Sequence, residues 1–377
     1  CFDLFERIYE EAWDIEVAQG SDSIIRESNE MPLTETYSDK AELLKHVPRL
    51  IIENNIHGVD IDPRAAQVAG LSLWLRAHNS WQQAGIKTLQ RPQILKSNIV
   101  CAEPMPGEKG FLQEFTSQLK PTVLGQLVEV IFEKMQLAGE AGTLLKIEKE
   151  IEEAIAGAKE VWRQQNQALG QFPDLAKIAK KRGEIDFDVS DIDDENFWLE
   201  AEEKILDALA QYSSSTSSEF TGQKRLFAAD AAKGFAFIDL CKKRFDVVLM
   251  NPPFGDSAKG VSSYLQSRFS NWNKNILCAF FSRMAELCVN GLIGSVIDRS
   301  IINKSTYEDF RKVDLLHNDA LEHIVDLGWG VLDGANVEVA SLIYSTAKSS
   351  QSTTNCIDLR EYDLDQKEEQ LKNIDNK

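Results

Sequence analysis

Residues 244–255 read RFDVVLMNPPFG, and this stretch decides the fold. Residues 244–250 form a continuous apolar run that ends at a turn, which is typical of a strand buried on both faces of a parallel sheet. Asn251-Pro252-Pro253-Phe254 follows directly. The motif is therefore expected at the carboxyl end of a parallel sheet, where open α/β folds bind their ligands.

The chemistry of this motif suits a planar ligand with an exocyclic amino group. Two consecutive prolines fix two φ angles and remove two backbone donors, which leaves a rigid loop rich in acceptors. The side-chain oxygen of Asn251 and the carbonyl of Pro252 can each accept one hydrogen from an NH2 group. Phe254 can stack on a ring, which is worth on the order of 1–3 kcal/mol per base. The alternative is a proline-rich turn with no ligand.

A second informative stretch lies near the start of the chain. Residues 56–61, IHGVDI, are a strand candidate, and Asp62-Pro63 follows as a helix cap with proline at the first helical position. Residues 64–81 continue as a helix. Asp60 would then lie at the end of a strand, where a carboxylate can accept hydrogen bonds from a vicinal diol, as in dinucleotide-binding folds. The alternative is a turn and cap alone.

The remaining periodicities predict an α/β protein with a mostly parallel sheet, flanking helices and a largely helical insertion. The chain divides into residues 1–104, the insertion 105–235, residues 236–347 with the Asn-Pro-Pro-Phe loop, and a polar start of a following region, 348–377. Further helices are expected at 1–19, 40–54, 275–289 and 306–317, and further strands at 94–100, 291–298, 321–327 and 337–345, the last two as a hairpin. In the insertion, an apolar 3-4 repeat over 144–161 predicts a helical hairpin or short coiled coil, the acidic run 184–203 a solvated loop or face, and Ser213–Ser218 a flexible turn or linker.

Composition limits the function. The 377 residues carry a net charge of −19, so cationic contacts with nucleic acid must be local or supplied by a part outside this sequence. No apolar run approaches the ~18–20 residues that span a bilayer, so we expect no membrane association. Six cysteines without a Cys-x-x-Cys pair and histidines without metal spacing predict a reduced, cytoplasmic protein with no metal. Asp298 and Arg299 could border a base pocket, although a surface ion pair is the simpler role.

Asn251–Phe254 resembles the catalytic motif of S-adenosylmethionine-dependent amino-methyltransferases, chiefly the DNA adenine-N6 enzymes, and residues 57–63, HGVDIDP, resemble that family's acidic motif. The resemblance implies a class I, Rossmann-like methyltransferase fold with S-adenosyl-L-methionine as cofactor. It implies that Asp60 holds the two ribose hydroxyls of the cofactor, that Ile61 lies against its adenine, and that Asn98 lies near the adenine amine. A turn-forming Asn98 is the alternative.

Residues 99–106, residues 331–335 and the large insertion resemble the adenine methyltransferases of BREX phage-defence systems (PglX type), and type IIG-like restriction–modification enzymes come next. The resemblance implies methyl transfer to N6 of an adenine flipped from double-stranded DNA. It also implies contacts with other defence proteins through the insertion.

One feature departs from the family. Such enzymes need a glycine-rich loop after their first strand, yet no Gly-x-Gly occurs between Cys1 and Asp60. We therefore expect the chain to begin just after that loop, without the first strand, and to be inactive by itself. Two alternatives remain: a protein glutamine N5-methyltransferase, since the same acceptors serve any planar amine, and a non-catalytic assembly module.

Overall fold

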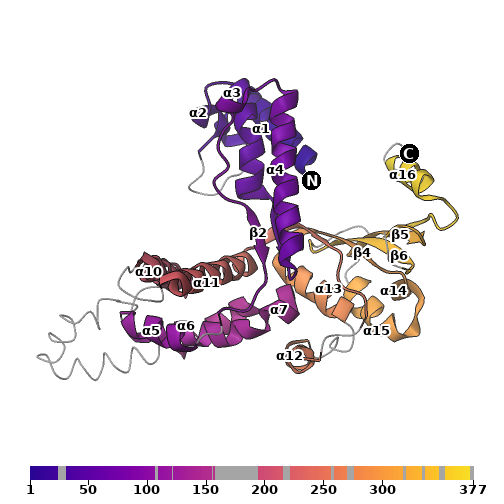
Figure 1. Ribbon diagram of the computed structural model, residues 1–377. Helices are drawn as coiled ribbons and strands as arrows, with labels where there is room; N and C mark the ends of the chain where they lie inside the picture. Colours follow the sequence, from indigo (N-terminus) through magenta and orange to yellow (C-terminus); the bar gives the residue numbers. More distant parts are fainter. Residues whose placement is uncertain are drawn as a thin grey trace, which may run out of the picture. The chain divides into compact units, whose positions relative to one another are not determined.

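Figure 1 shows the structure, a computed structural model. It describes residues 1–23, 31–106, 109–120, 122–154, 156–157, 194–214, 221–255, 259–269, 276–316, 320–332, 336–347 and 353–373. The chain forms two compact units, each treated by itself below. The first unit comprises Cys1–Gly142 with Ala154–Leu240, and the second comprises Thr143–Glu153 with Cys241–Lys377.

The first unit opens with a small helical layer. Its helices are α1 (Phe2–Gln19), α2 (Leu33–Thr36) and α3 (Lys40–Leu50), with a π-helical turn at Ile51–Asn55. Their apolar faces meet α4 (Pro63–Gln83) around Trp13, Leu43 and Trp81, which are buried. The indole N–H of Trp81 donates to the carbonyl of Lys45 at 2.8 Å, so the ring has a partner for its one polar group. The predicted helix 1–19 is confirmed.

A parallel strand pair follows. β1 (His57–Asp60) pairs with β2 (Asn98–Cys101), with His57 opposite Asn98 and Asp60 opposite Cys101. Asp62 caps α4 because its carboxylate accepts the N–H of Arg64 at 2.9 Å, and Pro63 opens the helix. The predicted strand, acidic turn and helix are confirmed. The second strand was predicted over residues 94–100 but begins only at Asn98.

The insertion is helical, as predicted. Its helices are α5 (Lys109–Gln118), α6 (Thr122–Lys134), α7 (Ala138–Ala141), α10 (Asp194–Ser214) and α11 (Thr221–Lys242). Phe115, Phe132, Tyr212 and Phe227 form its aromatic core, with ring centroids about 5.6–6.2 Å apart. Asp194–Glu203 is helical, so of the two alternatives for the acidic run, a solvated loop or a solvated face, the loop is excluded there; helix formation lets α10 bury Ala201 and Ile205. Residues 184–193 and 215–218 lie outside the described residues.

The second unit contains a five-stranded sheet. Its strands, in the order β3-β4-β6-β5-β7, are β3 (Phe245–Met250), β4 (Cys288–Asp298), β5 (Leu321–Gly328), β6 (Val339–Ser345) and β7 (Asn355–Asp358). β3 is parallel to β4 and β5 to β7, whereas β6 is antiparallel to both of its neighbours. The α/β class and the β5–β6 antiparallel neighbours are as predicted. Residues 355–358 join this sheet, although sequence reasoning had set 348–377 apart.

The second unit also contains helices. They are α12 (Ser262–Arg268), α13 (Ile276–Leu287), α14 (Ser300–Asn303), α15 (Glu308–Phe310) and α16 (Leu364–Lys372). Shorter 3₁₀ or π segments occur at Ser21–Ser23, Thr88–Gln90, Met135–Leu137, Gly142–Leu144, Ser305–Tyr307 and Arg311–Leu315. The predicted helix 306–317 is thus broken into short pieces. Phe281 of α13 packs with Ile297 and Phe310 in the main core of this unit.

β3 is less buried than its sequence predicted. Val248 packs under α13, but Val247 and Leu249, which point to the other face, are 57% and 64% exposed. β3 is the edge strand of its sheet. The prediction of burial on both faces was therefore wrong within this unit, because α13 covers only one face of the strand.

Buried charges join residues 143–153 to the helices beside the sheet. The guanidinium of Arg283, which is fully buried, donates to both carboxylate oxygens of Glu148 at 2.6 and 2.8 Å. It also donates to the carbonyl of Thr143 at 2.8 Å. Lys146 pairs with Glu286 at 2.6 Å. We call Lys146, Glu148, Arg283 and Glu286 the ion-pair cluster. Because its charges are paired and hydrogen-bonded, their burial is tolerated and fixes the position of the segment.

The helices of the described ranges include none that combines the length and apolar character needed to cross a membrane.

Candidate active site

The Asn-Pro-Pro-Phe loop leaves the sheet at the carboxyl end of β3. Met250 lies opposite Ser295 of the parallel strand β4, so the loop begins beside the last residues of that strand. The side chain of Asn251 is exposed, Pro252 is buried and Pro253 is exposed. Asn251 makes no hydrogen bond to another described residue, so its amide is available to a ligand. The loop therefore presents an amide to solvent from a backbone that a buried proline holds.

Phe254 has a structural role beside its predicted one. Its half-buried ring packs against an apolar cluster that includes Val325, Leu327, Val339 and Leu359. Gly255 then turns the chain with a φ of 105°, a value that favours glycine. Packing fixes the direction of the ring, so the part that stays exposed is pre-oriented for contact with a planar ligand.

Strand directions bring several other termini to the same edge. β4, β5 and β7 run parallel to β3 and end at Asp298, Gly328 and Asp358, and β6 begins there at Val339. In this register Val339 lies opposite both Asp298 and Gly328. The loop at Asn251 therefore shares its edge of the sheet with the turns that follow β4, β5 and β7.

Ion pairs between charged side chains connect the strand ends at this edge. Nε of Arg299 contacts both carboxylate oxygens of Asp326 at 2.8 Å, and Nη1 lies 3.4 Å from Glu338. Asp298 instead accepts the N–H of Ser300 at 2.7 Å. The simple surface ion pair predicted for Asp298 and Arg299 was wrong: Arg299 ties the end of β4 to β5, and its side chain is only 20% exposed.

The turn after β7 carries a further pair. Arg360 contacts Asp358 at 2.6 and 2.9 Å and lies 3.5 Å from Asp326. The hydrogen bonds from Arg360 lower the pKa of the Asp358 carboxyl to about 2. Asp358 is therefore ionised throughout the neutral range, and this part of the edge keeps a constant charge.

In the first unit, Asp60 and Ile61 lie together at the carboxyl end of β1. The exposed carboxylate of Asp60 accepts the N–H of Asp62 through Oδ1 at 2.8 Å. The side chain of Ile61 is 52% exposed. Arg64 donates to Asp62 and holds the pKa of that carboxyl below its usual range, in keeping with a helix cap. The two acids thus have separate roles: Asp62 begins the helix, and Asp60 faces solvent at the strand end.

Asn98 is not where the sequence placed it. It begins β2 opposite His57, at the amino end of the strand pair, and Asp60 lies three residues further on, ~10 Å away at the rise of a strand. Its side-chain amide donates to the carbonyl of Glu53 at 2.7 Å. The neighbour of Asp60 is instead Cys101, whose thiol pKa is raised to about 11, chiefly by burial. The strand predicted over residues 94–100 begins only at Asn98, so this residue lies at the amino end of the strand and not near its carboxyl end.

The predicted residues therefore form two groups. Asp60 and Ile61 lie in the first unit, and Asn251, Pro252, Pro253 and Phe254 lie in the second. The sequence reasoning missed the contacts of Arg299 with Asp326 and Glu338. Their signal was weak, since each residue follows or ends a different strand.

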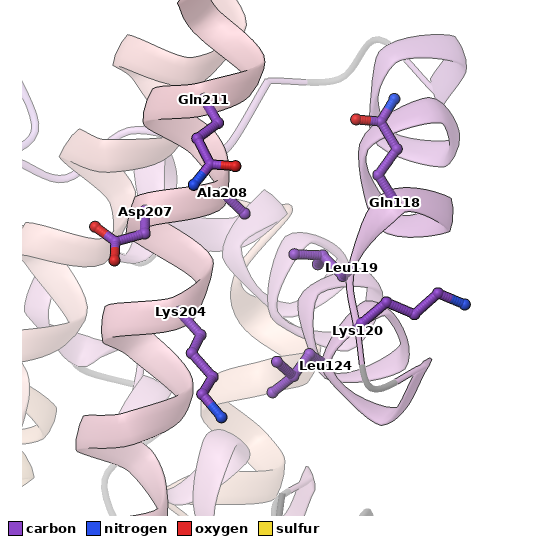
Figure 2. A pocket seen from close by; sticks show the side chains of 8 residues that line it. All are labelled: Gln118, Leu119, Lys120, Leu124, Lys204, Asp207, Ala208 and Gln211. Carbon is purple, nitrogen blue, oxygen red and sulfur yellow. The ribbon is translucent and has the colours of Figure 1, made fainter. Parts of the chain in front are cut away.

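A surface hollow of about 250 Å³ lies elsewhere, in the insertion of the first unit. Figure 2 shows it between α10 and the connection from α5 to α6, with Leu119, Leu124 and Ala208 at its base. Lys120 points away from α10, and Asp207 points away from the hollow. None of the predicted site residues lines it. The described ranges contain no group of three or more His, Cys, Asp or Glu side chains that could hold a metal ion.

The loop after β3 and the acidic strand end of β1 both lie within a stretch that matches a known class of protein. Residues 54–331 match the Eco57I restriction-modification methylase family, so the chain belongs to this family. The resemblance seen in the motifs is thereby confirmed at the level of the family. The two mostly parallel sheets agree with the class I methyltransferase fold that was predicted.

Two curated relatives are similar to parts of the chain. The adenine-specific methyltransferase BrxX of Escherichia coli O9:H4 (strain HS) is 38% identical over 63 residues, which is 17% of this chain and 5% of that protein. A predicted type II restriction enzyme and methyltransferase of Methanocaldococcus jannaschii is 23% identical over 320 residues, 78% of this chain and 26% of that protein. The chain thus spans a small part of the length of either relative.

Solved structures show weaker likeness. A predicted class I S-adenosylmethionine-dependent methyltransferase from Listeria monocytogenes is 13% identical and aligns with 71% of this chain and 99% of its own, with a TM-score of 0.29. A type I restriction-modification methyltransferase subunit from Streptococcus thermophilus is 12% identical and aligns with 96% and 88% of the two chains, with a TM-score of 0.28. Scores of this size do not define a common fold, so the assignment rests on the family match.

Proposed function

We propose that the complete protein transfers a methyl group from S-adenosyl-L-methionine to N6 of an adenine flipped out of double-stranded DNA. The reaction would serve phage defence or restriction–modification in the cytoplasm. Membership of the restriction-modification methylase family and the similarity to BrxX support it. The observation that carries it is Asn251, an exposed amide on a proline-stiffened loop at the carboxyl end of β3.

The loop residues provide position rather than covalent chemistry. The side-chain oxygen of Asn251 and the carbonyl of Pro252 accept the two hydrogens of N6. The nitrogen is drawn towards tetrahedral geometry, and its lone pair is directed at the methyl group. Most of the rate enhancement then comes from alignment of the two reactants. Phe254 stacks with the part of its ring that the apolar cluster leaves exposed. Flipping is required because N6 cannot be approached in line within the base stack.

Asp60 and Ile61 fit the adenosine part of the cofactor. The cofactor supplies the electrophilic methyl group on its sulfonium. The exposed carboxylate of Asp60 keeps Oδ2 clear of the hydrogen bond made by Oδ1, so it can accept from ribose hydroxyls. Ile61 offers an exposed apolar surface for an adenine ring. Asn98 stays outside this assignment, because its amide donates to the carbonyl of Glu53 at the opposite end of the strand pair.

The decisive experiment removes the amide. In the complete protein, Asn251→Ala should lower the rate of N6-methyladenine formation on unmethylated DNA by about a thousandfold or more, since both alignment and charge development depend on it. The affinity for S-adenosylmethionine, measured by calorimetry, should stay within about threefold. Asn303→Ala, an exposed asparagine on α14, is the matched control and should methylate DNA normally.

Near-normal N6-methyladenine formation by Asn251→Ala would reject the assignment. Incubation of the complete protein with labelled cofactor and either DNA or a protein extract separates this reaction from glutamine methylation. Label in protein alone would favour the glutamine enzyme, and label in neither would favour an assembly module. We also propose that the insertion contacts other proteins of the defence system, which co-purification of the complete protein would test.

A further inference from the structure

Trp329 occupies an unusual position in the second unit. It directly follows β5 in a Gly-Trp-Gly turn, and its side chain is 54% exposed. Gly328 and Gly330 have φ values of 65° and 79°, a region that other residues rarely adopt. The two glycines therefore shape a tight turn that carries the indole outward. An indole left in water forgoes the large stabilisation that burial of its ring would bring.

The backbone beneath this indole is fixed. Lys367 of α16 is 4% exposed, and its amine donates to the carbonyl of Trp329 at 2.9 Å. The side chain of Arg360 packs on Gly328, 3.1 Å from where a β-carbon would lie. Asp363 and Gln366 form a capping box that sets the start of α16. A charged amine is thus buried to hold the carbonyl of an exposed residue, which fixes the turn but leaves the ring available.

The strand order locates Trp329 relative to Asn251. β5 and β3 end at the same edge, with β4 and β6 between them. Three strand spacings of ~4.8 Å separate the two turns by about 14 Å across the sheet, and β3 ends three residues, or ~10 Å, before the level of Gly328, so the turns are roughly 17 Å apart. This separation is too large for one base to touch both residues. It corresponds to about five steps of stacked DNA at 3.4 Å per step.

The surroundings of the indole favour a base over a protein partner. Protein-binding hot spots are surrounded by other contacts that exclude water. Here the neighbouring turns carry Arg299, Asp326, Asp358 and Arg360, which are paired with each other in a charged rim. A ligand with an aromatic face and polar edges could stack on the indole of Trp329 and direct its polar edges toward this charged rim. Unpaired bases have this character, and they stack on aromatic side chains with little sequence preference.

We propose that Trp329 is a stacking platform for a second unpaired base of the bound DNA, distinct from the adenine held at Asn251. This inference rests on the proposed function, because it takes DNA as the ligand. The platform holds a displaced base near the target and so steadies the opened duplex. Trp329 acts in DNA binding and has no part in binding the cofactor.

The test uses the complete protein and a 15-nucleotide single strand of deoxyadenosine as the probe. Trp329→Ala should raise the Kd of the complete protein for this probe by about 5- to 100-fold, the range that loss of one base–aromatic stack produces. Trp329→Phe, which keeps a ring, should recover part of the affinity. Leu364→Ala removes an equally exposed apolar side chain at the start of α16 and should bind the probe normally.

Two further readouts make the outcomes distinct. The affinity for S-adenosylmethionine and the unfolding temperature should not change in Trp329→Ala, since the ring is exposed and belongs to a different unit from Asp60. Probe binding by Trp329→Ala equal to that of the unchanged protein would overturn the inference, even where N6-methyladenine forms normally. A loss of probe binding in a protein that makes no N6-methyladenine would instead retain the platform and reject the proposed reaction.

Discussion

The ion-pair cluster and the Asn-Pro-Pro-Phe loop lie in the same unit and are built in opposite ways. In the cluster, Arg283 and Glu148 are almost fully buried and pair through two hydrogen bonds. In the loop, Asn251 is exposed and has no partner among the described residues. The cluster is held by satisfied charges, whereas the loop is held by the rigid rings of Pro252 and Pro253.

This difference separates residues that stabilise the fold from residues that bind the substrate. The residues of the cluster reach α13 directly, and Tyr264 of α12 accepts the N–H of Lys146 at 2.7 Å. Both helices follow the loop along the chain, so the cluster fixes the segment into which the loop leads. The side chain of Asn251 in the loop has no hydrogen-bond partner within the described ranges, which fits a group that a substrate would satisfy. If this view is correct, changes in the cluster should alter stability, and changes in the loop should alter methyl transfer.

The largest effect is expected in the cluster. Glu148→Ala leaves the guanidinium of Arg283 buried without its carboxylate, and removal of one partner of a buried pair costs about 3–5 kcal/mol. The free energy of unfolding of the complete protein should fall by this amount. Hydrogen exchange of the amides in α13 and β4 measures the loss locally.

Two controls refine this prediction. Glu153→Ala removes an exposed partner of Arg268 and should cost at most about 1 kcal/mol. Replacing both buried partners, with Glu148→Leu and Arg283→Met, should restore most of the lost stability, because no unpaired charge remains. A double variant as unstable as Glu148→Ala would show that packing, rather than charge pairing, is what the cluster provides.

The second effect concerns Phe254, which both packs in an apolar cluster and is proposed to stack on a base. Phe254→Ala should lower the free energy of unfolding by about 2 kcal/mol, roughly half of the loss for a fully buried phenylalanine, because its ring is half-buried. It should also weaken DNA binding by the complete protein through the lost stack. Phe254→Leu should recover most of the stability but not the DNA affinity. Equal recovery of both quantities would mean that the ring serves packing alone.

Much of the fold could be predicted because its signals are local. Asp62 and Pro63 predict the start of α4, and an apolar run that ends just before Asn251 predicts β3. The strand over 355–358 was missed, since only its pairing with β5 makes a polar segment extended. The acidic start of α10 left a solvated loop and a solvated face as alternatives, because charge alone does not separate them, while burial of Ile205 supports a helix.

The site could be predicted where its residues are adjacent in the sequence. It could not be predicted where residues far apart in the sequence come into contact. Asn251 was found from its motif alone. The bond from Arg283 to Glu148 joins residues 135 positions apart, and no periodicity reports it. The one available signal was an arginine within the apolar helix of residues 275–289. Asn98 was misplaced because a shift of a few residues at the start of a strand moves a side chain to the other end of the pair.

A third, smaller effect compares the two prolines. Pro252→Ala should lower the free energy of unfolding by about 0.4–1 kcal/mol, since the unfolded chain gains freedom. It should lower kcat for DNA methylation about tenfold, because the carbonyl at 252 is less well positioned. Pro253→Ala changes an exposed ring and should have the weaker effect on kcat. If the two variants have the same kcat, the burial of Pro252 does not position the loop.

The smallest effect is expected at Asp314, a half-buried carboxyl of the segment Arg311–Leu315. Its Oδ2 is buried with no hydrogen-bond partner among the described residues, and burial raises its pKa. Because the folded protein binds this proton more tightly than the unfolded chain, the carboxyl contributes stability at pH values below its unfolded pKa of about 3.9. That contribution is lost as the pH rises through the folded pKa. Burial also raises the pKa of Tyr344, and the charge of Asp314 adds to this rise.

Asp314→Asn removes the titration. Denaturant unfolding of the complete protein should show a gain in stability for this variant that grows as the pH rises above about 4 and levels off once the pH has passed the raised pKa of Asp314 in the folded protein. Asp309→Asn, an exposed neighbour on α15, should show no such growth. A gain that is constant with pH would mean that Asp314 stays ionised in the folded protein as it does in the unfolded chain. In that case the core around Phe310 would accept a charge as the ion-pair cluster does, and the contrast between the two regions would weaken.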